Sequence, residues 1–150
     1  MRDSDMRILR LITLPCALSL AACGSIQVQN TDGTCSQTAV ASAGLLAYSG
    51  TLAAIDAGAP LEVLARIQSG VADSVKAGKV EIDILDIIIK DAGGAPWARY
   101  LAGVSVLFGE QIKAAVDKGV NAQVCAVPIL GSIAKGMEQA MAISAMKLAA

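Results

Sequence analysis

Apolar positions recur at intervals of three and four residues through most of the chain beyond residue 34, which is the spacing of one face of an α-helix. Glycine and proline interrupt this pattern at several points, and both residues are typical of helix boundaries. The pattern predicts five helical segments, at 36–57, 60–77, 80–91, 96–118 and 128–148. We therefore expect an all-α fold, a small bundle of four to five short helices.

The segment 36–57 has small residues on one face. Its alanines at four-residue spacing form a stripe onto which another helix can pack at short range: Ala39, Ala43 and Ala47. Its bulky apolar residues, which carry most of the side-chain volume, are Leu45, Leu46, Leu52 and Ile55. Thr34 is the candidate N-cap, and Gly58 is the predicted end.

Small residues at this spacing also line contacts between membrane helices. The run 35–55 has no charged residue and is long enough to span a bilayer, although its many Ala, Ser, Thr and Gly residues make it weakly apolar. Packing within the domain is the favoured interpretation. A hydrophobic hairpin that enters the bilayer is the alternative.

The segments 60–77 and 80–91 differ in how clearly their pattern indicates a helix. The segment 60–77 has one apolar face and one charged face. The apolar face consists of Leu61, Leu64, Ile67, Val71 and Val75, and the charged face of Arg66, Asp73 and Lys76. In 80–91 the first residues alternate as in a strand, but four charged residues form one helical stripe: Lys79, Asp83, Asp86 and Lys90. We interpret 80–91 as a helix, and as the central one because only a narrow stripe is polar.

The last two segments each begin at a proline. Pro96 opens a helix that ends before Gly119 and contains Trp97, Tyr100 and Phe108, three of the four aromatic residues. Its apolar stripe is completed by Leu101, Val104 and Leu107, and it indicates core packing more than a ligand or partner site. Residues 121–127 are expected to be a connection, with Pro128 starting the final helix. The apolar surface of that helix is expected to come from Ile129, Ile133, Met137, Met141 and Ile143.

The first 22 residues have the character of a secretory signal rather than of a folded element. An apolar run at 11–22 follows Arg2, Arg7 and Arg10. The run is about a dozen residues long, whereas a membrane-spanning helix needs about 20. An uncleaved membrane anchor is therefore the weaker interpretation.

The end of this run, Leu20-Ala21-Ala22-Cys23, resembles the lipobox of bacterial lipoproteins. The resemblance implies that Cys23 is acylated and that the chain is cut between Ala22 and Cys23. It implies a signal peptide at 1–22 and a lipidated N-terminus and polar tether at 23–34, followed by a helical domain at 35–150. The alternative is an ordinary signal peptide cut elsewhere, which leaves Cys23 as a plain thiol.

The residues after Cys23 bear on the membrane to which the anchor would attach. Gly24 and Ser25 follow it. In Gram-negative lipoproteins an Asp directly after the lipidated Cys resembles an inner-membrane retention signal, and this chain has no Asp at that position. The resemblance therefore implies an outer-membrane lipid anchor facing the periplasm in a Gram-negative cell. In a Gram-positive cell it implies the outer face of the single membrane.

Composition and charge limit the folds and the binding partners that the sequence allows. Hydrophobic residues make up 55% of the chain and aromatic residues only 3%, which favours tightly packed helices over an aromatic-rich sheet sandwich. Of the 12 basic and 13 acidic residues, three and two precede Cys23, which leaves a net charge of −2 beyond it. Without a basic block, the sequence predicts no binding of nucleic acid.

The cysteines fall into two groups. Cys16 would leave with the signal peptide and Cys23 would be lipidated, which leaves Cys35 and Cys125 as an even pair in an oxidising compartment. We expect a disulfide between them, and closing its loop of roughly 90 residues would contribute about 4–5 kcal/mol in the chain-entropy model. A redox or nucleophilic thiol is the alternative, but the chain has no His and no C-x-x-C at these positions.

No catalytic, cofactor or metal site is predicted. Carboxylates gather in one segment, but without the spacing of a calcium loop: Glu81, Asp83, Asp86 and Asp91. We expect a small membrane-anchored envelope lipoprotein that is not an enzyme, with a structural or protein-interaction role and an envelope protein as partner. The alternative is a membrane-active lipoprotein encoded by a phage or plasmid, acting in superinfection exclusion or lysis. An enzyme that uses carboxylates or a free thiol is the third and least favoured hypothesis.

Overall fold

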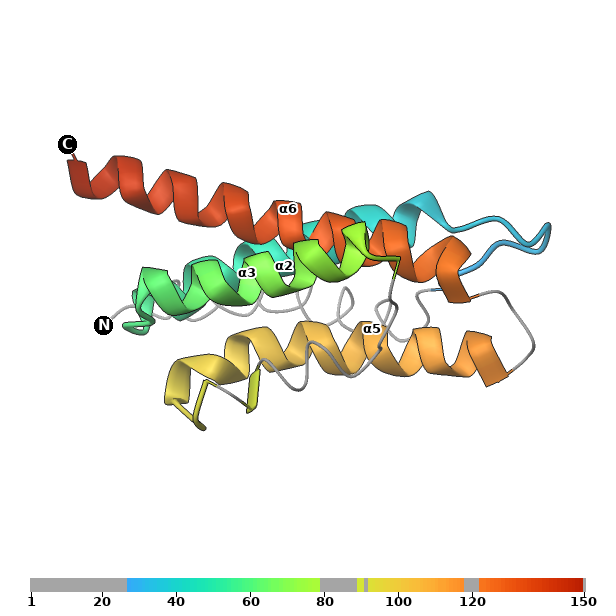
Figure 1. Cartoon of the computed structure of the whole chain (residues 1–150), viewed down its shortest axis with the longest axis horizontal. Coiled ribbons are helices and arrows are strands. Elements are labelled where there is room, and N and C mark those ends of the chain that lie inside the picture. Colours follow the sequence, from blue (N-terminus) through green and yellow to red (C-terminus); the bar gives the residue numbers. More distant parts are fainter. Residues whose placement is uncertain (1–26, 79–88, 91, 118–121, 150) are drawn as a thin grey trace, which may run out of the picture.

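The computed structural model describes residues 27–78, 89–90, 92–117 and 122–149. Within these residues the fold is all-α, which confirms the predicted class. The elements are α2 (Gln37–Asp56), α3 (Leu61–Lys76), the short 3₁₀ turn η2 (Pro96–Ala98), α5 (Arg99–Asp117) and α6 (Ala122–Ala149) (Figure 1).

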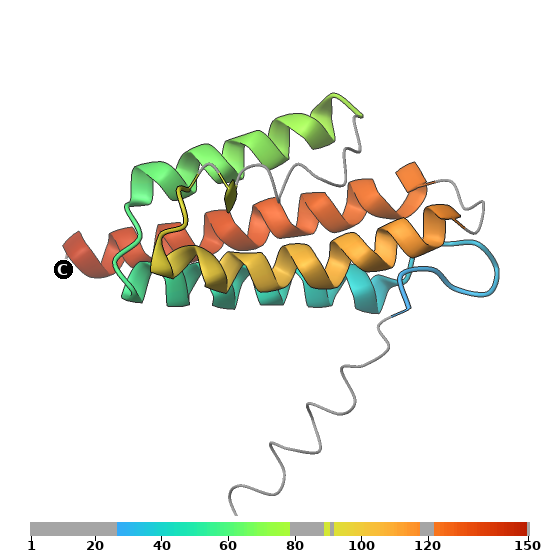
Figure 2. The ribbon, with the colours of Figure 1, turned by 90° about the horizontal axis from the view of Figure 1, so that it is seen from below.

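The four helices pack lengthwise. α2 and α6 lie side by side and run in the same direction, whereas α3 and α5 run in the opposite direction (Figures 1 and 2). The contact between α2 and α6 is the most extensive, and α3 packs on α6 while α5 packs mainly on α2. The last turns of α6 extend beyond the other helices (Figure 1).

The ends of α2 and α3 follow their local sequence signals. The Ser36 hydroxyl accepts a hydrogen bond from the backbone N–H of Ala39 at 3.3 Å, so Ser36 is the N-cap of α2 and the prediction of Thr34 is wrong. The Thr34 side chain instead donates to Asp32 at 2.6 Å. Gly58 and Gly78 follow the two helices with φ of 90° and 63°, a conformation that favours glycine, so the predicted end at Gly58 is confirmed and α3 ends in the same way.

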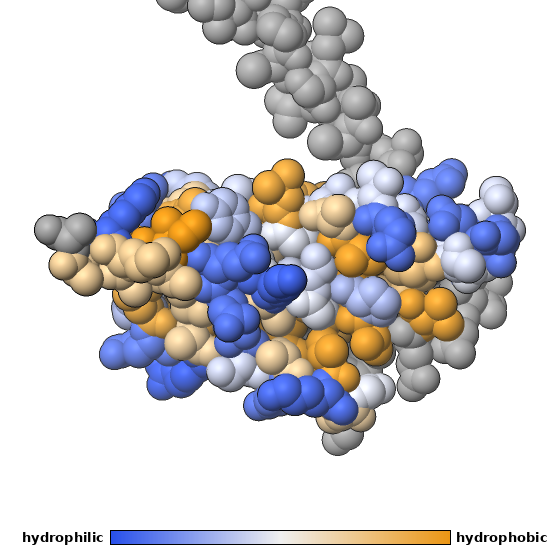
Figure 3. Space-filling view, turned by 90° about the horizontal axis from the view of Figure 1, so that it is seen from above, coloured by the Kyte–Doolittle hydropathy of each residue, from blue (hydrophilic) through white to orange (hydrophobic). Residues whose placement is uncertain are grey.

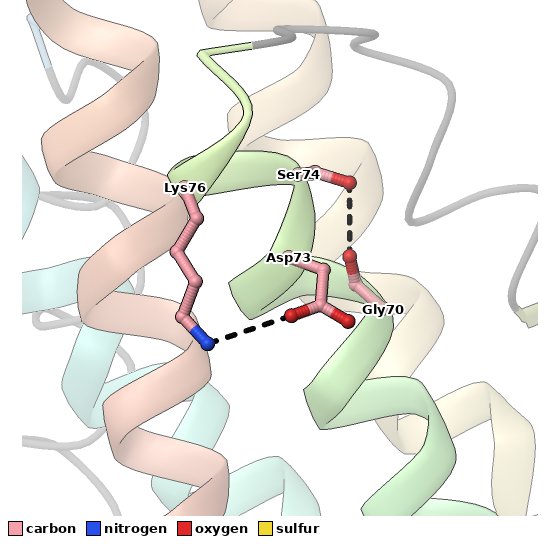
Figure 4. A network of polar contacts seen from close by, with 4 residues as sticks. All are labelled: Gly70, Asp73, Ser74 and Lys76. Atoms are coloured by element: carbon pink, nitrogen blue, oxygen red, sulfur yellow. Dashed lines mark hydrogen bonds and ion pairs between the residues drawn. The ribbon is translucent and has the colours of Figure 1, made fainter.

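The charged side of α3 faces solvent, as its pattern predicts. Figure 4 shows Lys76 Nζ 3.5 Å from Asp73 Oδ1, and the Ser74 hydroxyl donating to the Gly70 carbonyl at 2.9 Å. Both charged side chains are more than 70% exposed, so the pair adds little to stability. The opposite side of α3 is buried through Leu64, Ile67 and Val71.

The core is built largely from the predicted residues of α5 and α6. On η2 and α5 the buried apolar side chains include Trp97, Leu101, Val104 and Phe108. On α6 they include Ile129, Ile133 and Met137, with Met141 and Ile143 half-buried. The aromatic stripe is therefore core, as predicted, although Tyr100 and Leu107 are only half-buried.

α2 inverts the expected arrangement of large and small residues. The alanine stripe is buried as predicted, together with Ala54 and Thr51. However, Leu45 is 67% exposed and Leu46 is 37% exposed, so these two of the four bulky residues lie outside the core. The small residues face inward because neighbouring helices approach the backbone of α2 closely, and this leaves Leu45 on the outer face.

α6 starts earlier than its proline indicates. It begins at Ala122 and includes Pro128, so residues 122–127 are helical and not a connection. Pro128 has no N–H to donate to the Val124 carbonyl, which normally ends a helix. Here the extra turns bury Cys125 and Ala126, and that burial favours continuing the helix.

The segment before α2 is a closed turn. Gln29 and Cys35 form an antiparallel bridge, and the Gln29 side-chain amide donates to the Gly33 carbonyl at 2.6 Å. Val28 is only 4% exposed and belongs to the core. Within the second half of the predicted polar tether, Val28 therefore packs against the helices, whereas residues 30–34 form an exposed turn closed by the Gln29–Cys35 bridge.

Candidate functional site

Several predicted features lie outside the described residues. These are the lipobox residues Leu20, Ala21, Ala22 and Cys23, and most of the segment 80–91, with Glu81, Asp83, Asp86 and Asp91. The interpretation of 80–91 as the central helix therefore remains a prediction, although Ile89 and Lys90 are helical. Among the described residues, no three His, Cys, Asp or Glu side chains are grouped so as to hold a metal ion.

The structure brings Cys35 and Cys125 together from positions 90 residues apart. Cys35 precedes α2 and Cys125 lies in the first turn of α6. Both thiols donate to the same acceptor, the Val28 carbonyl oxygen, at sulfur-to-oxygen distances of 3.6 Å and 3.4 Å. The structure holds both as thiols, so the predicted disulfide remains a prediction.

The environment of these thiols makes them unsuited to nucleophilic chemistry at neutral pH. Burial, with a hydrogen bond to Cys125 and the proximity of that second thiol, raises the pKa of Cys35 from 9.0 to about 12. Cys125 is 3% exposed. Because the thiolate is the reactive form, the raised pKa of Cys35 and the burial of Cys125 indicate a structural role for the pair.

A second notable site lies where α2 crosses α6. A Cβ added at Gly136 would overlap the carbonyl oxygen of Gly44 and would lie 3.1 Å from the backbone nitrogen of Tyr48. A Cβ added at Gly44 would lie 2.5 Å from the Ser132 hydroxyl oxygen. The two backbones are therefore in direct contact, which is possible because both positions are glycine.

This crossing forms the floor of an open surface groove of about 390 Å³. Small residues and larger side chains both contribute to its lining. The lining residues are Ala41, Gly44, Leu45, Tyr48, Ser132, Lys135, Gly136 and Gln139. Seen from above, the face over α6 is a mosaic of apolar and polar residues and not one continuous apolar patch (Figure 3).

The crossing has a sequence signal that the pattern analysis did not use. Ser132, Gly136, Ala140 and Ser144 recur every four residues along α6. This small-residue stripe is the counterpart of the alanine stripe on α2, and such stripes allow helix backbones to approach closely. No comparable signal indicated that Val28 is buried, because it stands in a polar segment.

Comparisons with known proteins identify no relative. No protein-family model matches the chain, and neither a curated protein nor a solved structure is significantly similar to it.

Proposed function

We propose that this chain is a lipid-anchored protein of the bacterial cell envelope whose helical bundle binds another envelope protein, without an enzymatic step. Cys23 would hold the lipid, and in a Gram-negative cell the domain would face the periplasm from the outer membrane. The observation that best supports a binding role is the exposure of Leu45 on the wall of the α2–α6 groove.

The groove has the chemistry of a small protein interface. Leu45 and Tyr48 offer apolar and aromatic surface, while Lys135 and Gln139 provide a polar rim. Interfaces commonly combine an apolar or aromatic centre with a polar edge. A helix with one bulky side chain would fit such a groove better than a small polar ligand would.

Crosslinking of the full-length protein in its native membrane tests this proposal. Leu45→Glu should reduce the crosslinked partner at least tenfold, because it places a charge at the apolar wall of the groove. Val106→Glu on α5 is the matched control, since Val106 is 55% exposed and lies outside the groove lining. Equal crosslinking by both variants would contradict the groove as the binding surface.

A membrane-active role is the second candidate, and it rests on α2. Among the described helices, α2 alone is long and apolar enough to cross a membrane, with 20 residues and a mean hydropathy of 1.4. At 1.5 Å per residue it would span about 30 Å, close to the thickness of a hydrocarbon core. In the folded chain, however, its inward residues already pack against α5 and α6.

Solubility separates these two functions. The Cys23→Ser variant, exported with an ordinary signal peptide, should purify without detergent if the helices form a soluble domain. Retention of this unlipidated variant in the membrane would favour insertion of α2. Mass spectrometry of the wild-type N-terminus tests lipidation itself, which predicts acyl chains on Cys23 and loss of residues 1–22.

A further inference from the structure

Three segments of the chain meet at the carbonyl oxygen of Val28. It accepts a hydrogen bond from the backbone N–H of Ser36 at 2.9 Å and from the thiols of Cys35 and Cys125. Val28 belongs to the segment nearest the proposed anchor, Ser36 caps α2, and Cys125 lies in the first turn of α6. The two sulfurs therefore share one acceptor oxygen, at the end of the domain where α2 and α6 both begin (Figure 1).

We propose that oxidation of Cys35 and Cys125 to a disulfide ties the anchor-side segment covalently to α6, so that force on the lipid anchor reaches the α2–α6 pair directly. Export to an oxidising compartment, which is part of the proposed function, supplies the oxidant. The pairing itself rests on the geometry at Val28.

The reaction is thiol–disulfide exchange with a protein disulfide of the thiol-oxidase class. One cysteine thiolate of this chain attacks that disulfide, and a mixed disulfide forms as one oxidase sulfur leaves. The second cysteine then attacks the mixed disulfide and releases the other oxidase sulfur. The Cys35–Cys125 bond forms, two protons and two electrons leave the pair, and the oxidase disulfide is reduced to two thiols.

Oxidation does not leave the Val28 carbonyl without a donor. The two thiol hydrogens are lost, but the Ser36 N–H still donates to the Val28 carbonyl. A buried carbonyl left unpaired would oppose the reaction, because it would bear the full cost of its desolvation. The turn at 28–36 can therefore keep its hydrogen bonding in both redox states.

The burial of the pair predicts when the bond forms. Cys125 is 3% exposed, and the raised pKa of Cys35 leaves little thiolate at neutral pH. Exchange with an oxidase should therefore precede closure of the turn over α6. The finished bond should in turn resist reductants until the domain unfolds.

The disulfide would also define which end of the domain faces the membrane. Only five peptide links separate Cys23 from Val28, and they can span at most about 18 Å. α6 has 28 residues and is about 42 Å long. The start of α6 would lie near the lipid, and its far end, with Met146 and Leu148 more than 60% exposed, would point away.

Alkylation mapping of the full-length protein tests this proposal. Membranes are treated with N-ethylmaleimide in 8 M urea, so that buried free thiols are also labelled, and labelled cysteines are located by mass spectrometry before and after reduction. We expect Cys35 and Cys125 to be unlabelled before reduction. Dithiothreitol should expose them at least tenfold more slowly in buffer than in 8 M urea. Labelling of both before reduction, in protein already processed at Cys23, would overturn the proposal and leave the lipoprotein function standing.

A second measurement covers the case in which export itself fails. If peptides containing Cys16 are still present, the proposed lipoprotein function is wrong. The purified full-length chain is then denatured, reduced and refolded with glutathione disulfide, which tests the pairing alone. Formation of the Cys35–Cys125 bond supports the geometric inference, and its absence overturns it. Cys125→Ser is the control, because its hydroxyl can still donate to Val28, and it should leave Cys35 alkylatable after unfolding.

Discussion

Replacing Gly136 with alanine tests whether the α2–α6 crossing organises the fold. The added methyl group would overlap the Gly44 carbonyl oxygen and crowd the Tyr48 backbone nitrogen. These are backbone atoms of a helix and cannot move as a flexible side chain can. The two helices would have to separate by on the order of 1 Å, which weakens dispersion contacts along their whole interface.

The expected magnitude is the difference between two opposing terms. Overpacking a tight contact costs about 1–3 kcal/mol, and a clash with backbone belongs at the upper end of that range. Glycine to alanine in a helix interior returns about 1 kcal/mol through helix propensity. Gly136→Ala should therefore lower the free energy of unfolding by about 2 kcal/mol, and the melting temperature by about 8 °C.

Gly131→Ala on the same helix is the matched control. A Cβ at Gly131 would meet nothing closer than Val75 Cγ1 at 4.0 Å, so only helix propensity changes and stability should rise by about 1 kcal/mol. Urea unfolding of the Cys23→Ser chain, followed by circular dichroism, measures both variants. If Gly136→Ala proved as stable as Gly131→Ala, the close approach of α2 and α6 would be refuted.

Three further predictions concern single residues. Thr51 is fully buried, and its hydroxyl has no hydrogen-bond partner among the described residues. Thr51→Val removes this hydroxyl and should raise the free energy of unfolding by about 1 kcal/mol. Thr51→Ser keeps the hydroxyl but loses a methyl group, and it should lower the free energy of unfolding. Pro128→Ala should stabilise the domain by about 1–2 kcal/mol, because it restores an N–H that can donate to the Val124 carbonyl within α6. A loss of stability would instead place Pro128 at the start of the helix, where proline is favoured. In reduced protein the folded state keeps the Cys35 proton from pH 9.0 to about 12 while the unfolded chain loses it, so stability should fall with rising pH across that range. Equal pH slopes for reduced wild type and Cys35→Ser, each measured by urea titration, would contradict the raised pKa.

Local sequence rules located the helices well where one signal dominated. Gly58 and Gly78 end α2 and α3 because positive φ favours glycine at these positions. The predicted start of α6 was wrong because proline is found at two kinds of helix position. It is favoured in the first turn of a helix, but it also occurs inside one when burial on both sides outweighs the lost hydrogen bond.

The candidate sites were predictable to different degrees. Counting cysteines paired Cys35 with Cys125, since signal cleavage and lipidation would leave no other partner. The acceptor that both thiols share could not be predicted, because Val28 stands in a polar stretch whose alternation, at Ile26 and Val28, is too brief to indicate burial. Its burial depends on a turn closed by the Gln29–Cys35 bridge, a tertiary contact that hydropathy does not reveal.

The outward position of Leu45 follows from contacts that α2 makes on two other sides. Gly44 touches α6, and a Cβ at Gly50 would lie 2.7 Å from the Tyr100 carbonyl oxygen of the η2–α5 segment. At about 100° per residue the two glycines stand about 120° apart, with Ala47 between them and Leu45 about 160° from Ala47. Leucine at an inward position would hold the neighbouring backbones apart. Leucine is more apolar than alanine, so hydropathy alone predicts leucine inside and alanine outside. Where helix backbones lie this close together, side-chain size decides which residue faces inward, and the smaller alanine does. The exposed Leu45 beside the groove is thus a consequence of the glycine crossing, and a partner that covers it would bind without disturbing the core.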